Sequence, residues 1–265
     1  MCVPRCLGKT EQNFTIFEFD RSLPGVDTAA LTNRDLTMKA PLSMLLVVMI
    51  AALAPLVQAS EEVDEQRITT PAEALDALKA GNQRFLAGKP LKQDFSAQIE
   101  KTASGQQPYA GVLSCLDSRI PPEIIFDQGI GDIFVGRVAG NIEDINMIGS
   151  FEFASALVGT KLLVVMGHTS CGAVKGACAD AKLGNLTALL GDIRPSVDLI
   201  QEQHPEADVC AEPLVDEIAV DNVKRTIADI RDQSPVLVEL EEKGTLKIVG
   251  AMYDVTSGEV TFLEG

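Results

Sequence analysis

Two short apolar runs constrain the fold of this chain more than any other feature. Residues 109–116 (YAGVLSCL) and 161–166 (KLLVVM) are too short for buried helices, and the second is rich in β-branched residues. Each run therefore predicts a buried strand. Amphipathic helical patterns follow at 186–203 and 212–231. Because strands that alternate with helices favour a parallel sheet, the sequence predicts an α/β fold.

The remaining segments complete this expectation. It comprises a mainly parallel β-sheet core, flanking helices, an antiparallel edge strand and an N-terminal helical arm. Thr70-Pro71-Ala72-Glu73 has the pattern of a capping box with proline at the first helical position, which predicts a helix toward Phe85. The other expected elements are a buried strand over 132–138, a helix over 148–157, a short helix from Pro235, and a hairpin of strands 245–255 and 259–263.

Residues that bind metals stand at the ends of the first two predicted strands. Cys115 and Asp117 lie near the carboxyl end of the first strand, where side chains two residues apart point the same way. His168 directly follows the second strand, and Cys171 opens the next helix. Because open α/β sheets bind their ligands at the carboxyl ends of strands, we expect these side chains to meet.

Two thiols and one imidazole form a ligand set that suits zinc. Cys115, His168 and Cys171 would leave one tetrahedral position for water, which is typical of a catalytic zinc rather than a closed structural site. Thr169 or Ser170 can cap the helix that Cys171 opens, and a helix N-terminus favours a thiolate. The alternative is that both cysteines are ordinary buried thiols.

The segments around these residues resemble β-class carbonic anhydrases of the exported bacterial type, from about Pro71 to the C-terminus. The matching segments are LKAGNQRF (78–85), SCLDSRIPPEIIFDQGIGDIFVGRVAGN (114–141), SFEFA (150–154) and VVMGHTSCGAVKGA (164–177). The resemblance implies the reversible hydration of CO2 to bicarbonate and a proton, by attack of zinc-bound hydroxide in an apolar pocket.

The resemblance also assigns roles to single residues. It implies Cys115, His168 and Cys171 as the zinc ligands. Asp117 and Arg119 become a catalytic dyad that orients the hydroxide and gates the metal. In the open form Asp117 pairs with Arg119, whereas in the closed form it binds zinc and blocks water.

The residues that the resemblance places around the substrate form a second group. It implies that Gln106 and the backbone of Gly172 help to orient the substrate, and that Phe134 and Val138 contribute to the apolar pocket. One position departs from the family pattern, because the second phenylalanine of SFEFA, Phe153, is often tyrosine. A role of that tyrosine in proton transfer is therefore not carried over.

Two other functions fit the same site. The zinc hydroxide could hydrolyse carbonyl sulfide or carbon disulfide, and access to the pocket would select among these substrates. A catalytically inactive zinc scaffold or sensor is the second alternative. The Asp117–Arg119 pair argues against the scaffold, because a structural site does not need a dyad that directs water.

A further signal lies near the beginning of the chain. Met38-Lys39 precedes an apolar run over 44–57, and small residues follow up to Ala59. This pattern predicts a secretory signal peptide over residues 38–59 and a periplasmic location. The run is shorter than the roughly 20 residues that span a bilayer and it contains Pro55, so a membrane anchor is less favoured.

The signal peptide divides the chain into three expected parts. Residues 1–37 are expected to be a non-native upstream extension or a disordered leader, and residues 60–265 a single domain. Residues 1–59 hold five basic and five acidic residues, so the net charge of −16 belongs to residues 60–265. This charge argues against nucleic acid and anionic membranes as partners. We expect no stable membrane association after cleavage, and the resemblance implies a homodimer or homotetramer in which the N-terminal helix packs on a partner.

Three residues outside the metal pattern leave alternatives open. Cys178 and Cys210 can pair in an oxidising compartment, or Cys178 can be a small buried side chain. His204 is the only other histidine besides His168. It is either a solvated loop residue or a proton shuttle that titrates near neutral pH.

Overall fold

The computed structural model describes residues 67–263, and these residues form a five-stranded sheet in the order β2-β1-β3-β4-β5. The signal peptide and the upstream segment predicted over residues 1–59 lie outside the described residues. The strands are β1 (Ala110–Ser114), β2 (Ile133–Arg137), β3 (Leu162–His168), β4 (Lys247–Tyr253) and β5 (Val260–Phe262). β1 to β4 are parallel, and β5 pairs antiparallel with β4 at one edge. The prediction of a mainly parallel sheet with an antiparallel edge strand is confirmed.

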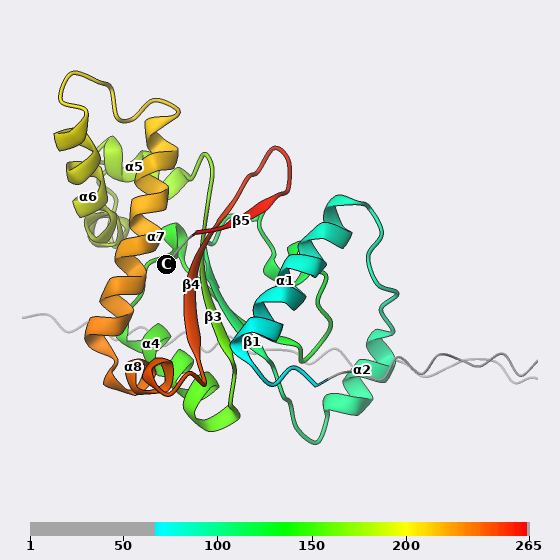
Figure 1. Cartoon of the computed structure of the whole chain (residues 1–265). Helices are drawn as coiled ribbons and strands as arrows, with labels where there is room; N and C mark the ends of the chain where they lie inside the picture. The colour runs from blue at the N-terminus through cyan, green and yellow to red at the C-terminus, as the bar shows by residue number, and fades with distance from the viewer. Residues whose placement is uncertain (1–66, 264–265) are drawn as a thin grey trace, which may run out of the picture. The chain divides into compact units, whose positions relative to one another are not determined.

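Helices lie on both sides of this sheet (Figure 1). They are α1 (Pro71–Leu86), α2 (Phe95–Thr102), α3 (Pro122–Ile125), α4 (Ile145–Glu152), α5 (Gly172–Cys178), α6 (Leu186–Gln203), α7 (Leu214–Gln233) and α8 (Pro235–Glu242). α1 lies on one side, while α7 and α8 lie on the other, where α7 contacts β3 and β4. Within residues 67–263, none of the helices has both the length and the apolarity needed to cross a bilayer.

The N-terminal helix α1 begins as the sequence predicts. The side chain of Thr70 accepts a hydrogen bond from the Glu73 amide at 3.2 Å, and Glu73 reaches back to the Thr70 amide, so the capping box is complete. α1 buries Ala74 and Leu78 in the core of its own chain. Packing of this helix on a partner subunit stays a prediction.

Two expected elements differ from the structure. The helix predicted over 148–157 begins earlier, at Ile145, because the carboxylate of Asp144 accepts hydrogen bonds from two amides of its first turn. It then widens into a π-helix, η2 (Phe153–Val158). The strand predicted as buried over 132–138 is only half-buried. β2 is an edge strand with one neighbour, so part of its surface faces outward.

The arrangement of the central strands determines where a site can form. β1 lies between β2 and β3, so the chain leaves β1 toward one edge of the sheet, whereas β3 and β4 extend toward the other. β1 and β3 are buried along their whole lengths. Open α/β sheets bind their ligands at the carboxyl ends of the strands where the order reverses. In this sheet that position lies just after Ser114 and Met166, which are paired in register.

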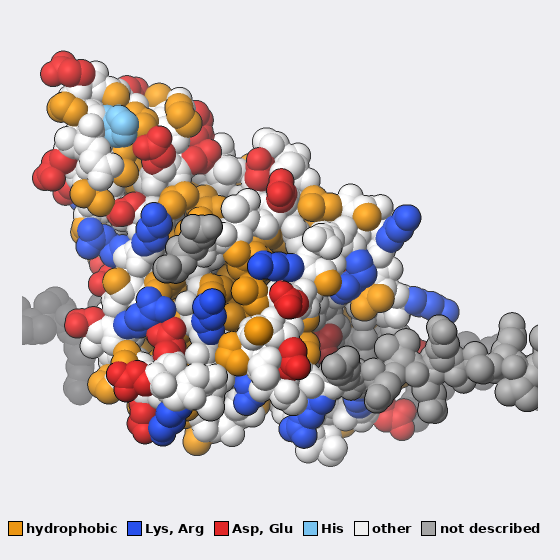
Figure 2. Space-filling view, in the orientation of Figure 1, with side chains coloured by type: hydrophobic (Ala, Val, Ile, Leu, Met, Phe, Trp, Pro, Cys, Tyr) orange, Lys and Arg blue, Asp and Glu red, His pale blue; other side chains and the backbone are white. Residues whose placement is uncertain are grey.

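Acidic side chains are unevenly spread over the surface. On the face drawn in Figure 2, Asp and Glu gather around the ends of α6 and α7, while hydrophobic side chains lie together near the middle of the face.

Candidate metal centre

The three predicted ligands come together at the point where the strand order reverses. Cys115 directly follows β1, His168 is the last residue of β3, and Cys171 immediately precedes α5. One ligand atom from each side chain lies within 4.8 Å of the other two. All three residues are buried, with exposed fractions of 4% for Cys115, 0% for His168 and 1% for Cys171.

The ring of His168 is oriented to bind a metal through Nε2. Its Nδ1 lies 2.9 Å from the Thr169 carbonyl oxygen, so Nδ1 carries the proton and donates it. Nε2 is buried and has no hydrogen-bond partner within the described residues. Because a buried polar atom normally has a partner, a metal ion between Nε2 and the two sulfurs would satisfy it. The residues therefore fit a metal site.

The two thiols influence each other directly. A hydrogen bond from Cys171 lowers the pKa of the Cys115 thiol, and contacts with His168 and the Gly140 amide act in the same direction. The same contact, together with burial, raises the pKa of the Cys171 thiol. The pair thus loses its first proton readily, which favours the thiolate that binds metal.

The backbone before Cys171 is held by a network that replaces the predicted helix cap. Neither Thr169 nor Ser170 caps α5, because Cys171 itself occupies the cap position and makes no capping hydrogen bond. Ser170 adopts a left-handed conformation with φ of 53°. Its amide donates to Asp216 at 2.8 Å and its hydroxyl to Glu212 at 2.9 Å. The Thr169 hydroxyl instead accepts a hydrogen bond from the turn after β4.

Asp117 lies beside the three ligands and is held by Arg119. Arg119 Nε and Nη2 donate to the two carboxylate oxygens of Asp117 at 2.9 and 2.7 Å. This pair lowers the pKa of Asp117 to about 2. The Oδ2 atom of Asp117 lies 3.9 Å from His168 Nε2. The arrangement is the one that the resemblance assigns to the open form.

Two further residues support Cys115 and were missed in the sequence. Arg137 Nε donates to the Cys115 carbonyl oxygen at 3.1 Å, and its Nη2 donates to the Asp117 carbonyl oxygen. The Gly140 amide donates to Cys115 Sγ at 3.3 Å. The only sequence signal for either residue was its place within the segment 114–141, which carries the family resemblance.

Two of the four predicted substrate residues lie next to the metal ligands. The backbone of Val138 is hydrogen-bonded to Ser114 and Leu116, at 3.1 and 3.2 Å, and so flanks Cys115. Gly172 follows Cys171 at the start of α5, and a Cβ atom placed on it would meet nothing within 4 Å. Open space therefore lies in front of this glycine.

The other two substrate residues do not reach the metal ligands within one chain. Gln106 is exposed and precedes β1, close to Pro108, whose carbonyl accepts a hydrogen bond from Thr160 at the amino edge of the sheet. Strands rise about 3.3 Å per residue, so Pro108 and Cys115 lie about 20 Å apart. Phe134 pairs with Gly111, also well before the end of β1.

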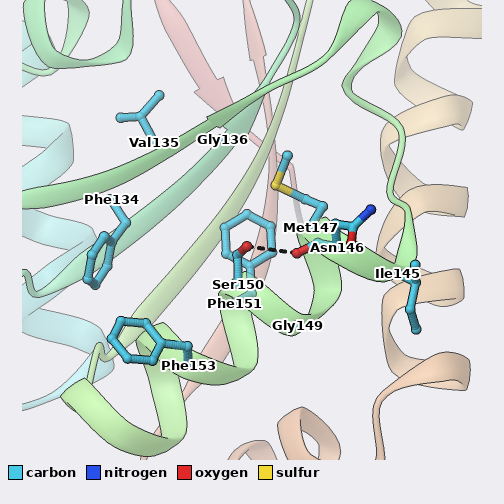
Figure 3. Close-up of a pocket in the computed structure, with 10 residues that line it drawn as sticks. All are labelled: Phe134, Val135, Gly136, Ile145, Asn146, Met147, Gly149, Ser150, Phe151 and Phe153. Carbon is cyan, nitrogen blue, oxygen red and sulfur yellow. Dashed lines mark hydrogen bonds between the residues drawn. The ribbon is translucent and has the colours of Figure 1, made fainter.

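Phe134 instead belongs to an exposed apolar surface, which we call the β2 surface. It contains a pocket with a volume of about 690 Å³. The rings of Phe134 and Phe153 face each other there, edge to face, with centroids 6.4 Å apart (Figure 3). The residues that line the pocket are Phe134, Val135, Gly136, Ile145, Asn146, Met147, Gly149, Ser150, Phe151 and Phe153.

The remaining candidates lie outside the metal centre. Cys178 and Cys210 are free thiols, and Cys178 Sγ lies 3.8 Å from the Val209 carbonyl oxygen. The structure therefore does not pair them in a disulfide. His204 Nε2 lies 3.4 Å from a carboxylate oxygen of Glu217 in a half-exposed position. Its role as a proton shuttle stays a prediction.

Comparison with known proteins identifies the family. The family model described as carbonic anhydrase matches residues 110–260, which include all three ligands and the Asp117–Arg119 pair. Carbonic anhydrase 2 of Mycobacterium tuberculosis is 39% identical over 191 residues, which cover 72% of this chain and 91% of the relative. A β-carbonic anhydrase of Aspergillus fumigatus has a similar structure, with a TM-score of 0.59 and 29% identity over 72% of this chain and 90% of that one. The chain belongs to the β-class carbonic anhydrases.

Other members of the family agree with this assignment. The carbonic anhydrase of Mycolicibacterium smegmatis is 38% identical to this β-carbonic anhydrase over 195 residues, which cover 72% of this chain and 93% of the relative. A chain from the crystal structures of two tetrameric β-carbonic anhydrases of Sordaria macrospora gives a TM-score of 0.57 at 27% identity, covering 64% of this chain and 91% of that one.

Proposed function

We propose that this β-carbonic anhydrase hydrates CO2 reversibly with a zinc ion held by Cys115, His168 and Cys171. The convergence of two thiols and an unpartnered imidazole nitrogen in one buried group supports zinc as the cofactor. Bound zinc would supply a Lewis acid that makes a water molecule acidic enough to lose a proton near neutral pH. The surrounding residues of the protein would then orient the attacking oxygen and the CO2 molecule.

Asp117 and Arg119 are proposed to orient the attacking oxygen. Arg119 holds both carboxylate oxygens of Asp117, and one of them lies 3.9 Å from the His168 nitrogen that faces the two sulfurs. A carboxylate with a pKa of about 2 is ionised at neutral pH and can only accept hydrogen bonds. It would therefore fix the orientation of a water or hydroxide beside it. The Arg119 fork also keeps Asp117 away from the metal ligands.

The pocket for CO2 needs little polar recognition, because CO2 carries no charge. Val138 borders Cys115, and open space lies in front of Gly172 at the N-terminus of α5. We propose that CO2 lies in this space, with its carbon toward the attacking oxygen and one oxygen near the Gly172 backbone. Partial positive charge at a helix N-terminus would favour the negative charge that develops on that oxygen.

We also propose that the substrate pocket is completed by a second copy of the chain. Gln106 and Phe134 lie too far from Cys115 to act on the same metal centre, so any direct role requires a neighbouring subunit. The β2 surface, which contains Phe134, is apolar and exposed at an open sheet edge. Large exposed apolar patches mark interaction sites. The tetrameric state of the Sordaria macrospora relatives supports an oligomer.

Mixed oligomers test this sharing of residues. Cys115→Ser removes a ligand from its own site, whereas Gln106→Ala would damage only the partner's site. After equal mixing and subunit exchange, half of the dimers are hybrids with one intact site each, so about a quarter of the wild-type activity should return. If both variants are inactive alone and no activity returns in proven hybrids, the two residues act in the same subunit and the proposal is wrong.

Export is proposed from the sequence of residues 38–59, which lie outside the described residues. Mass spectrometry of the N-terminus of the protein purified from its host tests it. A mature chain that begins near Ser60 would support export and cleavage. A chain that retains residues 44–57 would contradict it.

The reaction itself is tested against the hydrolysis of carbonyl sulfide and carbon disulfide. Zinc-loaded protein should form bicarbonate from CO2 in a stopped-flow assay, lose this activity when a chelator removes the metal, and regain it with zinc. Sulfide release that is faster than CO2 hydration at equal substrate concentration would assign the site to the other substrates. Stoichiometric zinc without either activity would favour a scaffold.

A further inference from the structure

The two sulfurs of the metal centre differ in the hydrogen bonds that support them. Cys171 stands at the start of α5 and makes no capping hydrogen bond. Cys115 stands at the end of a strand, and its sulfur accepts a hydrogen bond from the Gly140 amide at 3.3 Å. Gly140 lies 25 residues from Cys115 in the sequence, so contacts elsewhere in the fold must hold this donor in place.

The local sequence alone does not determine the backbone conformation of Gly140. It lies in the short 3₁₀ turn η1 (Ala139–Asn141) with φ of 76°, and Asn141 also has a positive φ of 47°. Glycine and asparagine are the residues that adopt the left-handed region most readily, so the sequence permits this turn, but contacts elsewhere must select it over other conformations. The positive φ favours glycine at this position, and a Cβ atom there would lie 2.5 Å from Ile193 Cδ1, which would have to move. Its amide points at Cys115 only while this conformation is kept.

One buried side chain from a distant helix holds this turn. Asn222 lies in the middle of α7 with only 2% of its surface exposed. Its Nδ2 donates to the Gly140 carbonyl oxygen at 2.8 Å. α7 also packs along β3, the strand that ends in His168. Asn222 thus links the turn that supports Cys115 to a helix that packs on β3 and β4.

We propose that Asn222 is a positioning residue for the metal ligand Cys115. It fixes the Gly140 carbonyl, so that the amide of the same residue stays directed at Cys115 Sγ, 3.3 Å away. A hydrogen bond from an amide removes charge from a thiolate and orients its lone pairs, which sets the strength of the metal–sulfur bond. The inference rests on the proposed function, because it requires Cys115 to bind the metal.

A purely structural role for Asn222 is the alternative. A buried amide on a helix needs a partner whatever the neighbouring chemistry, and the Gly140 carbonyl would satisfy it. Both roles predict a loss of stability when the side chain is replaced. Only a positioning role predicts a change at the metal, so the test must observe the metal directly.

The test compares Asn222→Leu with Thr226→Val in the full-length holoprotein. Leucine keeps the branched shape of asparagine and its number of heavy atoms, but it cannot donate to Gly140. Thr226 is equally buried one turn further along α7, with 2% of its surface exposed, so its replacement controls for the loss of a buried polar group on this helix. Each variant is loaded with zinc for competition against a chelator. Each is also loaded with cobalt(II), which has a sulfur-to-metal charge-transfer band, and is melted to compare stability.

The proposal predicts a specific difference between the variants. Asn222→Leu should weaken zinc binding by about 10- to 100-fold, because Cys115 Sγ is no longer held in its orientation. It should also shift the cobalt charge-transfer band to longer wavelength, because the sulfur loses the Gly140 hydrogen bond and keeps more charge. Thr226→Val should leave both unchanged. An Asn222→Leu protein with the wild-type band and wild-type zinc affinity, at any melting temperature, would overturn the proposal. If the unmodified protein bound no zinc, the proposed function itself would fail.

A measurement on the unmodified protein covers the case in which Asn222→Leu does not fold. With ¹¹³Cd in place of zinc, the Gly140 amide proton should show a scalar coupling to the metal through the hydrogen bond to Cys115. The Asn222 side-chain amide should exchange slowly with solvent. Absence of the coupling, or fast exchange of the Asn222 amide, would overturn the proposal without any variant.

Discussion

The metal centre and the β2 surface differ in how far a single chain completes them. At the metal centre, three buried ligand atoms lie within 4.8 Å of one another, and all come from one chain. On the β2 surface, Phe153 is 49% exposed and Ile145 is 76% exposed. This difference supports the proposal that a single chain holds the metal, whereas a second subunit completes the substrate pocket.

The positions of the two regions in the sheet explain this difference. β1 and β3 are central strands covered on both faces, so the residues at their carboxyl ends are held close together. β2 has a neighbour on only one side, and its other side remains open. Edge strands with apolar surfaces are usually covered by another part of a protein or by another copy.

Loss of a ligand should have the largest effect. Cys115→Ser should reduce bound zinc from about one ion per chain to almost none and reduce CO2 hydration to the uncatalysed rate, because two ligands hold zinc poorly. Cys178→Ser, which changes a half-buried free thiol outside the centre, is the control. Elemental analysis and stopped-flow kinetics measure both effects. Equal zinc content in the two variants would contradict the assignment of Cys115 to the metal centre.

Loss of the guanidinium should leave the metal but remove turnover. Arg119→Ala should lower kcat by about 100-fold at neutral pH with zinc still bound, because Asp117 is then free to move onto the metal. Arg194→Ala is the control, because it removes a similar pair on the surface of α6, in which Arg194 Nε lies 2.7 Å from Asp198 Oδ1. It should change neither kcat nor zinc content. Full activity of Arg119→Ala at neutral pH would refute the gating role.

A charge on the β2 surface should impair oligomer formation and activity without affecting the metal centre. Phe134→Asp places a charge where a partner would bury it, so it should reduce the oligomer to smaller species and lower activity about tenfold or more, while zinc remains bound. Leu183→Asp is the control, since Leu183 is 70% exposed in the loop between α5 and α6. Sedimentation velocity and zinc analysis give the readouts. Full activity of a proven monomer would show that one chain completes the pocket.

The contacts of Glu212 with Lys175 and Ser170 should have the smallest effect, and that effect should be on stability. Lys175, at 3.0 Å, and the Ser170 hydroxyl lower the pKa of Glu212. Glu212→Gln should reduce the free energy of unfolding at pH 7 by about 0.5 kcal/mol or less, because the pair is exposed. The pKa of Glu212 is lower in the folded protein than in the unfolded chain, where it is about 4.3. The difference in free energy of unfolding between wild type and Glu212→Gln is therefore largest well above that pH and shrinks as the pH falls below it.

Urea unfolding of the wild-type and Glu212→Gln proteins, measured at several pH values between 7 and the acid range, gives the difference in free energy of unfolding that tests this prediction. Glu239→Gln is the control, because Glu239 pairs with Lys243 on α8 and has no contact with the loop before Cys171. A difference between Glu212→Gln and wild type that grows as the pH falls would contradict the expected sign.

Local patterns predicted that the three side chains would meet, because Cys115 and His168 lie at strand ends and Cys171 lies beside the start of a helix. Cys115 and His168 follow from strand ends, and Cys171 follows from the helix that begins beside it. The helix cap was wrong for the opposite reason. Ser170 has a high capping tendency, but contacts with Asp216 and Glu212, more than 40 residues away, place it in a left-handed conformation instead.

The long-range support of Cys115 and the incomplete burial of β2 could not be predicted from the sequence. Asn222 and Gly140 are 82 residues apart, and no spacing rule joins them. The apolar run 132–138 predicted a buried strand, whereas β2 is half-buried in one chain. An apolar strand pattern shows that a surface will be covered, but it does not show whether the same chain or another copy covers it.

X-ray absorption at the zinc edge of the purified, active protein tests the central claim most directly. We predict one zinc per chain with two sulfur neighbours at about 2.3 Å and nitrogen or oxygen neighbours at about 2.0 Å. The sulfur shell should shrink to one neighbour in any metal retained by Cys171→Ser. Full CO2 hydration by a protein without zinc, or with zinc surrounded only by nitrogen and oxygen, would contradict a centre built from Cys115, His168 and Cys171.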